Sequence, residues 1–263
     1  MKKSDFFVKG WCRFDYDPRL AKWVRHALPF ARESVKSPEN QHWLRCGGTW
    51  FAGVNGLPNA SDGSLEGGSK LECDAVDFIS QALGLTGFEW DTAQVSVCYP
   101  NYPQPMEDEK PAAYRFRRNR DAAHTDGLLA EGPDRRRHLR EYHGFILGIP
   151  MVEYDSGASP FVVWEGSHEI IRQVFKHCFE GLSPQLWGSL DVTEIYHQAR
   201  DKIFEQCQRV LISARPGEAY LAHRLTLHGI SPWKNQANAG LDGRMICYFR
   251  PEISGPEGWL FNP

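Results

Sequence analysis

The segment His124-Thr125-Asp126 places an imidazole and a carboxylate two positions apart. On an extended strand, residues i and i+2 point to the same side, so one short segment offers a nitrogen and an oxygen ligand to a single metal ion. With a second histidine from another segment, these donors form the 2-His-1-carboxylate facial triad of non-haem Fe(II) oxygenases. A tripeptide of this kind also arises by chance in a chain with 10 histidines, so its surroundings must support it.

Two downstream histidines are candidates to complete the triad. His223 and His228 lie in AYLAHRLTLHGISPW, and on one continuous strand they face opposite sides, so only one of them points into a pocket. Gly229 and Pro232 follow His228 and predict a turn that leaves its imidazole at the mouth of a barrel. We therefore favour His228 over His223 as the third ligand. A lone histidine is more often a hydrogen-bonded core or surface residue, so the assignment depends on the whole set.

An arginine suited to binding a carboxylate follows, at the start of RMICYFRP. On a strand, Arg244, Ile246 and Tyr248 share one face, and a guanidinium there can hold a carboxylate through two hydrogen bonds. Arg250 has the same phase but stands at the strand end, which makes it the weaker candidate. A surface ion pair is the alternative role for Arg244. Ser231 offers a hydroxyl to the same carboxylate, although turn formation before the next proline is the simpler explanation.

Two groups of arginines flank the metal motif, Arg115, Arg117, Arg118 and Arg120 before it and Arg135, Arg136, Arg137 and Arg140 after it. The second group lies in GLLAEGPDRRRHLREYH, which predicts a loop that overhangs the pocket. Arg135, Arg136 and Arg137 would then attract an anionic small-molecule substrate, such as a carboxylate or a coenzyme A thioester. A solvated charged loop is the simpler explanation. Trp164 is a candidate to line the pocket, although a tryptophan is more often a core or rim residue.

The bulk composition limits the class of protein. A chain of 263 residues can bury a full core in one large domain. The hydrophobic content of 41% and net charge of −3 are ordinary for soluble globular proteins and give no general attraction to nucleic acid. No apolar run is long enough to span a membrane, and the first residues lack the apolar stretch of a secretory signal. Seven scattered cysteines without a CxxC pair predict reduced thiols in the cytoplasm and no thiolate zinc site.

The elements that must position these residues change in character along the chain. Helices are predicted after Asp17-Pro18 and over residues 71–84 and 193–208. From about residue 94, short aromatic and β-branched segments between glycines and prolines predict strands. These segments are QVSVCYP, EYHGFILGIP, SPFVVWEGSH, QRVLISAR, GEAYLAHR and RMICYFRP.

We expect one α+β domain over residues 1–263, with a mainly β core. Residues 1–90 are expected to hold helices and loops that support the core. Residues 91–250 are expected to form a barrel or sandwich of two sheets, and residues 251–263 a tail. The glycine-rich stretch that begins at Cys46 and continues through GVNGLPNASDGSLEGGSK matches neither a P-loop nor a dinucleotide-binding fingerprint, so we expect loops and short strands there.

Taken in order, HTDG, SPFVVWEGSHE, LHGISPW and an arginine on the next strand resemble the phytanoyl-CoA dioxygenase family over about residues 90–250. The resemblance implies a double-stranded β-helix of the jelly-roll or cupin type, with Fe(II), 2-oxoglutarate and O2 as cofactor and co-substrates. It implies that His124, Asp126 and His228 bind the iron and that Arg244 binds the distal carboxylate of 2-oxoglutarate. The turn EGSH matches the family's PGSH turn, with glutamate in place of proline.

The same resemblance implies hydroxylation of an unactivated C–H bond in a small organic substrate, with release of succinate and CO2. Asp126 argues against the halogenating branch, in which a small residue replaces that ligand. Two alternatives stay open: a cupin-like metalloenzyme that does not use 2-oxoglutarate, and a catalytically silent binding protein of the same fold. Binding of a carboxylate at Arg244 would distinguish a 2-oxoglutarate-dependent enzyme from the first alternative. Consumption of oxygen would distinguish it from the second. The identity of the substrate and the oligomeric state are not predicted.

Overall fold

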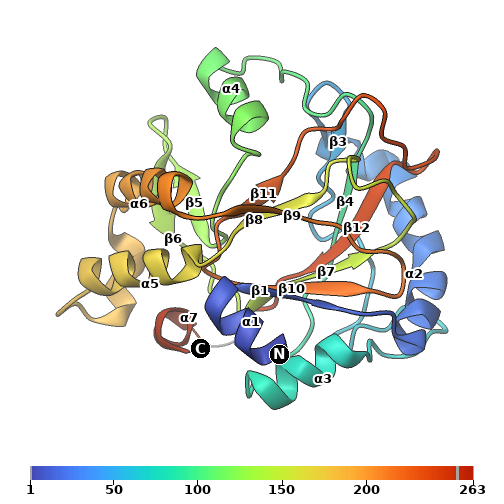
Figure 1. Ribbon diagram of the computed structural model, residues 1–263, viewed down its shortest axis with the longest axis horizontal. Coiled ribbons are helices and arrows are strands. Elements are labelled where there is room, and N and C mark those ends of the chain that lie inside the picture. Colours follow the sequence, from blue (N-terminus) through green and yellow to red (C-terminus); the bar gives the residue numbers. More distant parts are fainter. Residues whose placement is uncertain (1, 253–254, 263) are drawn as a thin grey trace.

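Two antiparallel sheets run through the molecule, with helices packed around them (Figure 1). The computed structural model describes residues 2–252 and 255–262. The helices are α1 (Lys2–Lys9), α2 (Pro18–Lys36), α3 (Asp74–Ala82), α4 (Pro111–Asn119), α5 (Ser167–Cys178), α6 (Thr193–Gln206) and α7 (Gly255–Phe261), with 3-10 helices η1 (Pro38–Trp43) and η2 (Pro184–Ser189). The strands are β1 (Trp11–Phe14), β2 (Leu44–Arg45), β3 (Trp50–Phe51), β4 (Gln94–Cys98), β5 (Leu128–Glu131), β6 (Arg136–Leu139), β7 (Phe145–Pro150), β8 (Phe161–Trp164), β9 (Arg209–Ile212), β10 (Ala219–His223), β11 (His228–Ile230) and β12 (Arg244–Phe249).

The chain crosses repeatedly between the two sheets. The larger sheet has the order β1-β10-β7-β12-β4-β3-β2, and the smaller one has the order β11-β8-β9. Strands β7, β10 and β12 belong to the larger sheet, whereas β8, β9 and β11 between them in sequence belong to the smaller one. This crossing brings segments that are distant in sequence face to face. Helices around a large antiparallel sheet agree with the predicted α+β class.

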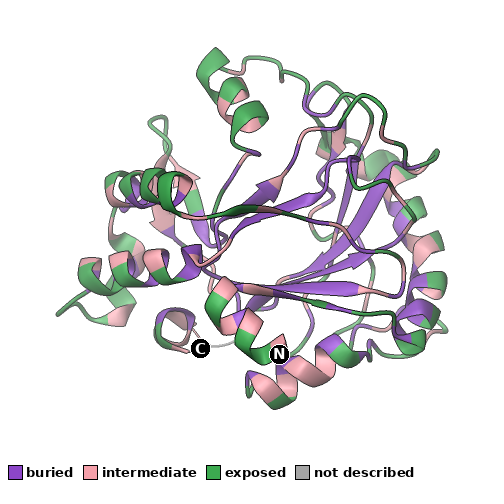
Figure 2. Ribbon diagram, in the orientation of Figure 1, coloured by how far each residue is buried: buried purple, intermediate pink, exposed green. Residues whose placement is uncertain are grey.

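Strand β12 shows how alternation along the sequence makes two faces. Met245, Cys247 and Phe249 pack into a core cluster that residues of α2 and α3 also join. Ile246 and Tyr248 join a cluster with side chains from both sheets, so they face the space between the sheets. All of β12 is buried, as are most of the neighbouring strands in Figure 2. A strand buried on both faces reads as a nearly continuous apolar run, which is what RMICYF shows after its first residue.

The predicted helices are confirmed where their capping and periodicity were clear. Asp17 caps α2 by accepting a hydrogen bond from Arg19 N at 2.8 Å, and Pro18 occupies the first helical turn. Helices α3 and α6 lie within the predicted ranges 71–84 and 193–208. Among the described residues, no helix combines the length and the apolar character needed to cross a membrane.

Several segments differ from the sequence expectation. Residues 1–90 also contribute strands to the larger sheet: β3 pairs with β4, and β1, which the sequence pattern did not predict, pairs with β10. The stretch around residues 135–137, expected as a loop, forms the hairpin β5–β6. The expected tail 251–263 includes α7, whose Trp259 and Leu260 are buried. The sequence pattern also does not predict α4 or α5. Strands of two to four residues are too short for a periodic pattern to reveal them.

Candidate metal centre

A two-bond backbone bridge joins the segment of His124 to β11. His124 N donates to His228 O at 2.8 Å, and His228 N donates to His124 O at 2.9 Å. The two imidazole rings therefore lie beside each other, with centroids 4.5 Å apart. Backbone pairing, rather than proximity in sequence, brings the two histidines together.

Asp126 completes a cluster of three ligand atoms. Its Oδ1 atom lies 3.3 Å from His124 Nε2 and 3.6 Å from His228 Nε2. One ligand atom from each residue lies within 4.8 Å of the other two. Donors about 2.1 Å from one ion and at right angles to each other lie about 3 Å apart, so the cluster needs only a small inward movement to hold a divalent metal. In the part of the chain that the structure describes, no other group of three His, Cys, Asp or Glu residues meets this criterion.

Backbone carbonyls select the histidine tautomer that a metal needs. His124 Nδ1 lies 3.0 Å from Ala122 O, and His228 Nδ1 lies 2.9 Å from Thr226 O, so each Nδ1–H donates to a carbonyl. Each Nε2 then presents its lone pair toward Asp126, which is how metal-binding histidines are generally held. Burial lowers the pKa of His228 below its ordinary value, despite the opposing effect of Asp126, and keeps that ring neutral.

Asp126 stays ionised although it is only 6% exposed. Burial by itself raises the pKa of Asp126. The positive charge of Arg250 is the largest influence that opposes burial, and the pKa of Asp126 lies well below the ordinary carboxyl value. The cluster therefore offers two imidazole nitrogens and one anionic oxygen, the donor set of non-haem Fe(II) sites.

Two glycines let the backbone reach this geometry. Gly127 follows Asp126 with φ +89°, and a Cβ at this position would lie 2.4 Å from Glu141 O. Gly229 follows His228, and a Cβ there would lie 2.1 Å from Asp121 O. A larger side chain at either position would push apart the segments that carry the three ligand atoms.

Arg244 is a buried guanidinium that faces the space between the sheets. Its exposed fraction is 0%, and its Nη2 donates to Tyr248 Oη at 3.0 Å. Within residues 2–252 and 255–262, Nε and Nη1 of Arg244 have no hydrogen-bond partner. Buried charges in proteins are normally paired, so two unsatisfied N–H groups on one buried guanidinium indicate a place for an anion. A carboxylate fits best, because it accepts two parallel hydrogen bonds.

Tyr248 extends this anion site and connects it to the metal cluster. Tyr248 Oη accepts hydrogen bonds from Arg244 Nη2 and from Tyr220 Oη, each at 3.0 Å, which leaves its own hydrogen to donate to a carboxylate. The Tyr248 ring lies 5.8 Å from the Phe161 ring, and Phe161 stacks on His228 at 5.4 Å between centroids. The guanidinium and the three ligand atoms thus share one interior. Strand alternation placed Tyr248 on the face of Arg244, but the sequence did not assign it a role.

Ser231 and His223 have other partners. Ser231 Oγ accepts a hydrogen bond from Arg209 Nη2 at 3.1 Å. His223 ends β10 in the larger sheet, and His228 begins β11 in the smaller sheet after a turn. The two histidines therefore lie on strands of different sheets rather than on one continuous strand. His228 joins the cluster, whereas His223 Nε2 contacts Arg172 at 2.8 Å.

The arginines that follow the metal motif mostly bind other parts of the protein. Arg136 forms ion pairs with Asp191 and Glu194. Arg137 Nη1 donates to a backbone carbonyl of β5 at 2.9 Å. Arg135 lies in the turn of the β5–β6 hairpin and is exposed. Of these three arginines, Arg135 alone points to solvent as an unpaired loop residue would.

Trp164 lies in the core rather than at an opening. It is 3% exposed and packs edge to face on Phe204 of α6, with ring centroids 5.3 Å apart. Residues alternate between faces along β8, and Phe161 and Val163 occupy the face toward the space between the sheets. Trp164 has the opposite phase and belongs to the cluster under α5 and α6. The structure therefore does not bring it to the three ligand atoms.

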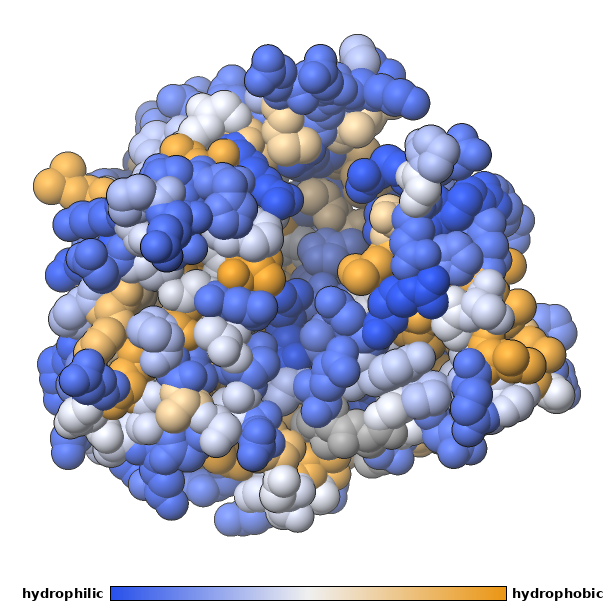
Figure 3. Space-filling view, turned by 180° about the vertical axis from the view of Figure 1, so that it is seen from behind, coloured by the Kyte–Doolittle hydropathy of each residue, from blue (hydrophilic) through white to orange (hydrophobic). Residues whose placement is uncertain are grey.

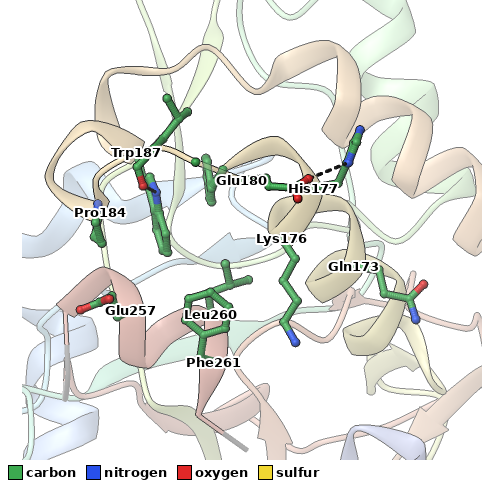
Figure 4. Close-up of a pocket in the computed structure, with 12 residues that line it drawn as sticks. Gln173, Lys176, His177, Glu180, Pro184, Trp187, Glu257, Leu260 and Phe261 are labelled. Atoms are coloured by element: carbon green, nitrogen blue, oxygen red, sulfur yellow. Dashed lines mark hydrogen bonds and ion pairs between the residues drawn. The ribbon is translucent and has the colours of Figure 1, made fainter.

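The surface has two features that bear on access. A groove between α5, η2 and α7 is lined by Lys176, Trp187 and Phe261, among others, and none of the candidate ligands lines it (Figure 4).

The face opposite to that seen in Figure 1 is hollowed near its centre, with hydrophilic and hydrophobic residues around the hollow (Figure 3). The His124 side chain is 48% exposed and that of His228 is 6% exposed, so solvent reaches the cluster from the side of His124.

Comparison with known proteins identifies the fold. No family model matches the chain, and no curated protein matches it by sequence. Among solved structures, it is similar to EctD from S. alaskensis with 2-oxoglutarate and 5-hydroxyectoine, with 13% identity, a TM-score of 0.51 and coverage of 97% of this chain and 77% of that one. It is also similar to SnoK, a non-haem α-ketoglutarate-dependent carbocyclase from nogalamycin biosynthesis, with 11% identity, a TM-score of 0.50 and coverage of 96% and 83%. Nearly the whole chain therefore has the fold of these two proteins.

Proposed function

We propose that this protein is a non-haem Fe(II)- and 2-oxoglutarate-dependent oxygenase. In this proposal His124, Asp126 and His228 hold the iron, and Arg244 with Tyr248 holds the distal carboxylate of 2-oxoglutarate. The observation that carries it is the buried guanidinium of Arg244, with two unsatisfied nitrogens, in the same interior as the three ligand atoms. A metal cluster alone would fit many reactions, whereas a metal cluster with a carboxylate clamp fits a keto-acid co-substrate.

The shared fold supports this proposal. We interpret the two crossing sheets as the double-stranded β-helix of this enzyme class. The metal cluster lies on β11 and on the segment before β5, and the clamp lies on β12. The reaction that we propose is hydroxylation of a C–H bond. SnoK is described as a carbocyclase, so the same fold also serves another outcome, and the outcome in this protein depends on its substrate.

The residues of this chain have separable tasks in the proposed reaction. O2 would be the oxidant: bound iron would activate it with two electrons from 2-oxoglutarate, which would become succinate and CO2, and one oxygen atom would go to succinate and the other to the substrate. His124 and His228 present Nε2 because their Nδ1 atoms are bonded to backbone carbonyls. Asp126 supplies the anionic donor. The walls formed by Phe161 and Tyr248 exclude water and keep the Arg244 charge in a low-dielectric interior, where it attracts a carboxylate strongly.

The substrate that we propose is a small organic molecule. The two flanking arginine groups suggested an anionic one, but Arg136 and Arg137 already have protein partners. Among residues 135–137, the suggestion of an anionic substrate now depends on Arg135. Once a substrate is known, Arg135→Ser should raise its Michaelis constant and weaken the salt dependence of that constant if the anionic class is correct.

Binding experiments test the proposal without knowledge of the substrate. Calorimetry with Mn(II), an oxygen-stable substitute for Fe(II), should show one metal site in the wild type, and 2-oxoglutarate should bind only after the metal. His124→Ala and Asp126→Ala should abolish both events, because each removes one of three ligands. His177→Ala, at an exposed histidine on α5, serves as the matched control and should behave as the wild type. With Fe(II), a substrate screen should then find compounds that stimulate succinate release and oxygen consumption.

The same experiment separates the two alternatives. A wild-type protein that binds metal but no 2-oxoglutarate would be a cupin-like metalloenzyme of another kind. A protein that binds metal and 2-oxoglutarate but never consumes oxygen, with any compound screened, would be a binding protein of this fold. Metal binding that survives His124→Ala and Asp126→Ala would contradict the assignment of the ligands.

A further inference from the structure

The two oxygens of Asp126 have different surroundings. Oδ1 faces the Nε2 atoms of both histidines, at 3.3 Å from His124 and 3.6 Å from His228. Oδ2 faces away from them and accepts a hydrogen bond from Arg250 Nη1 at 3.3 Å. One carboxylate oxygen of Asp126 therefore points to the proposed metal position, and the other is hydrogen-bonded to the guanidinium of Arg250.

Arg250 is anchored independently of Asp126. Its backbone N donates to both oxygens of Asp91, at 2.9 and 3.1 Å. Its carbonyl accepts a hydrogen bond from His143 Nδ1 at 2.5 Å, and His143 Nε2 in turn contacts Glu141 Oε2 at 3.0 Å. The Arg250 side chain is 22% exposed. The guanidinium thus reaches Asp126 from a backbone position that Asp91 and His143 hold in place, with Glu141 in turn bound to His143.

Arg250 stands at the end of the interior face of β12. It directly follows β12 and has the same phase as Arg244 and Tyr248, so this strand and the residue after it supply the carboxylate clamp and the partner of Asp126. The two arginines differ in what they meet. Arg244 Nε and Nη1 have no hydrogen-bond partner among the described residues, and neither does Arg250 Nε, but Arg250 Nη1 donates to a carboxylate of the protein itself.

The number of oxygens that a carboxylate gives to a metal decides how many positions remain for other molecules. One oxygen with two imidazoles leaves three positions of an octahedron open, whereas both oxygens leave only two. A keto-acid that binds through two donors, together with dioxygen, needs three positions. Oδ2 is free to join the metal unless something else holds it.

We propose that Arg250 is a positioning residue that keeps Asp126 bound to the metal through Oδ1 alone. This inference rests on the proposed function, because it assumes that the metal and 2-oxoglutarate bind where that proposal places them. Arg250 holds Oδ2 by a charge-assisted hydrogen bond and so preserves the third open position. Its positive charge also opposes a divalent cation nearby, so Arg250 favours co-substrate binding at some cost in metal affinity.

Three variants test this role. Arg250→Gln removes the charge and the reach of the guanidinium, and Arg250→Lys keeps a charged donor. Arg19→Gln is the control, because Arg19 also binds a buried aspartate, Asp17, but lies on α2 away from the metal cluster. Calorimetry measures Mn(II) affinity and then 2-oxoglutarate affinity of the Mn(II)-loaded proteins. Water-proton relaxation of the Mn(II)-loaded proteins reports the number of metal-bound waters, a readout that does not depend on activity.

A positioning role predicts opposite changes in the two affinities. Arg250→Gln should bind Mn(II) at least as tightly as the wild type, but 2-oxoglutarate should bind about 10-fold to 100-fold more weakly, a loss of the size by which residues that orient metal ligands change metal affinity or activity. In Arg250→Gln, the number of Mn(II)-bound waters derived from the relaxation rate should fall from about three to about two, because Asp126 Oδ2 takes one coordination position. Arg250→Lys should restore part of the 2-oxoglutarate affinity, and Arg19→Gln should match the wild type in both affinities.

Other outcomes would overturn the proposal in distinguishable ways. A wild type that binds no Mn(II) removes the proposed function and this inference with it. A wild type that binds both ligands, with an Arg250→Gln variant identical to it, leaves the proposed function intact and refutes the role of Arg250. Loss of Mn(II) and 2-oxoglutarate affinity in parallel, in Arg250→Gln and Arg250→Lys alike, would show that Arg250 only supports the local structure.

Discussion

At the scale of single residues, Arg244 combines a cost in stability with a use in binding. A guanidinium with an exposed fraction of 0% has lost its hydration, and one hydrogen bond to Tyr248 replaces only part of it. Removing a charged group from water without full compensation costs several kcal/mol. An evolved protein keeps such a residue where its function needs an unsatisfied charge.

Replacement of Arg244 should therefore change stability and binding in opposite directions. Arg244→Met fills a similar volume without the charge, and we expect the metal-free protein to gain about 1 to 3 kcal/mol in its free energy of unfolding, as found when other buried charges are replaced. The same variant should lose at least about 100-fold in 2-oxoglutarate affinity, because two charge-assisted hydrogen bonds disappear. Urea unfolding and calorimetry measure the two effects.

The control for Arg244→Met is Tyr248→Phe, which keeps the charge and removes one hydroxyl donor. It should bind 2-oxoglutarate about 10-fold more weakly, in keeping with the loss of one hydrogen bond to a charged group. A lower stability of Arg244→Met than of the wild type would mean that the protein itself satisfies this guanidinium.

At the scale of elements, Asp17 fastens two helices together. Its Oδ1 accepts a hydrogen bond from Arg19 N at the start of α2, and its Oδ2 accepts one from Asp74 N at the start of α3. Arg19 Nη2 lies 2.9 Å from Asp17 Oδ2 and 3.0 Å from Asp77 Oδ2. Side chains of α2 and α3 pack against the outer face of β12. The Asp17 carboxylate therefore helps to fix the two helices that cover this strand.

The Asp17 carboxylate makes part of the stability depend on pH. Burial raises the pKa of Asp17, but Arg19 and the two backbone N–H groups outweigh it, and the folded pKa lies below the ordinary value of 3.8. Asp17→Asn should cost about 1 kcal/mol, since asparagine still caps α2 but cannot accept from Asp74 N and bind Arg19 in the same way. Because the folded pKa is lowered, the advantage of the wild type should be complete above pH 3.8 and disappear as the pH falls below it.

Urea unfolding of the wild type and Asp17→Asn at several pH values measures this difference. A gap in unfolding free energy that stays constant from neutral pH to well below 3.8 would mean that the charge of Asp17 has no part in it. Asp15→Asn, at an exposed aspartate beside the same helix, is the matched control and should change little.

At the scale of the whole molecule, the proposed ligands join the two sheets. His228 lies on β11 of the smaller sheet, and Arg244 lies on β12 of the larger sheet. A metal held by His228 and a co-substrate held by Arg244, when bound to each other, would therefore link the two sheets. Binding to the folded state alone stabilises a protein by mass action.

Thermal unfolding should reveal this linkage as two separate increments. Each ligand at about 100 times its dissociation constant should add about 2.7 kcal/mol to the free energy of unfolding, and a chelator should remove both increments. Arg244→Met should keep the increment from Mn(II) and lose the one from 2-oxoglutarate. Equal stabilisation of the wild type and His124→Ala by Mn(II) would place metal binding elsewhere on the protein.

The sequence by itself determined the local features of this protein. The spacing of His124 and Asp126, the alternation that puts Arg244 and Tyr248 on one face, and the capped start of α2 all depend on residues within one or two turns or strand steps. Periodic patterns express such short-range geometry directly. The same rule does not show that the chain turns between His223 and His228, which lie on strands of different sheets.

The tertiary structure alone decided which distant residues meet. The bridge between His124 and His228, the bond from Arg250 to Asp126 and the core position of Trp164 join segments that no local pattern relates. These contacts depend on which strands pair and how the sheets cross, and that order is set by the packing of the whole core. The residues able to bind a metal and a carboxylate could therefore be predicted from the sequence, whereas their arrangement around one interior required the fold.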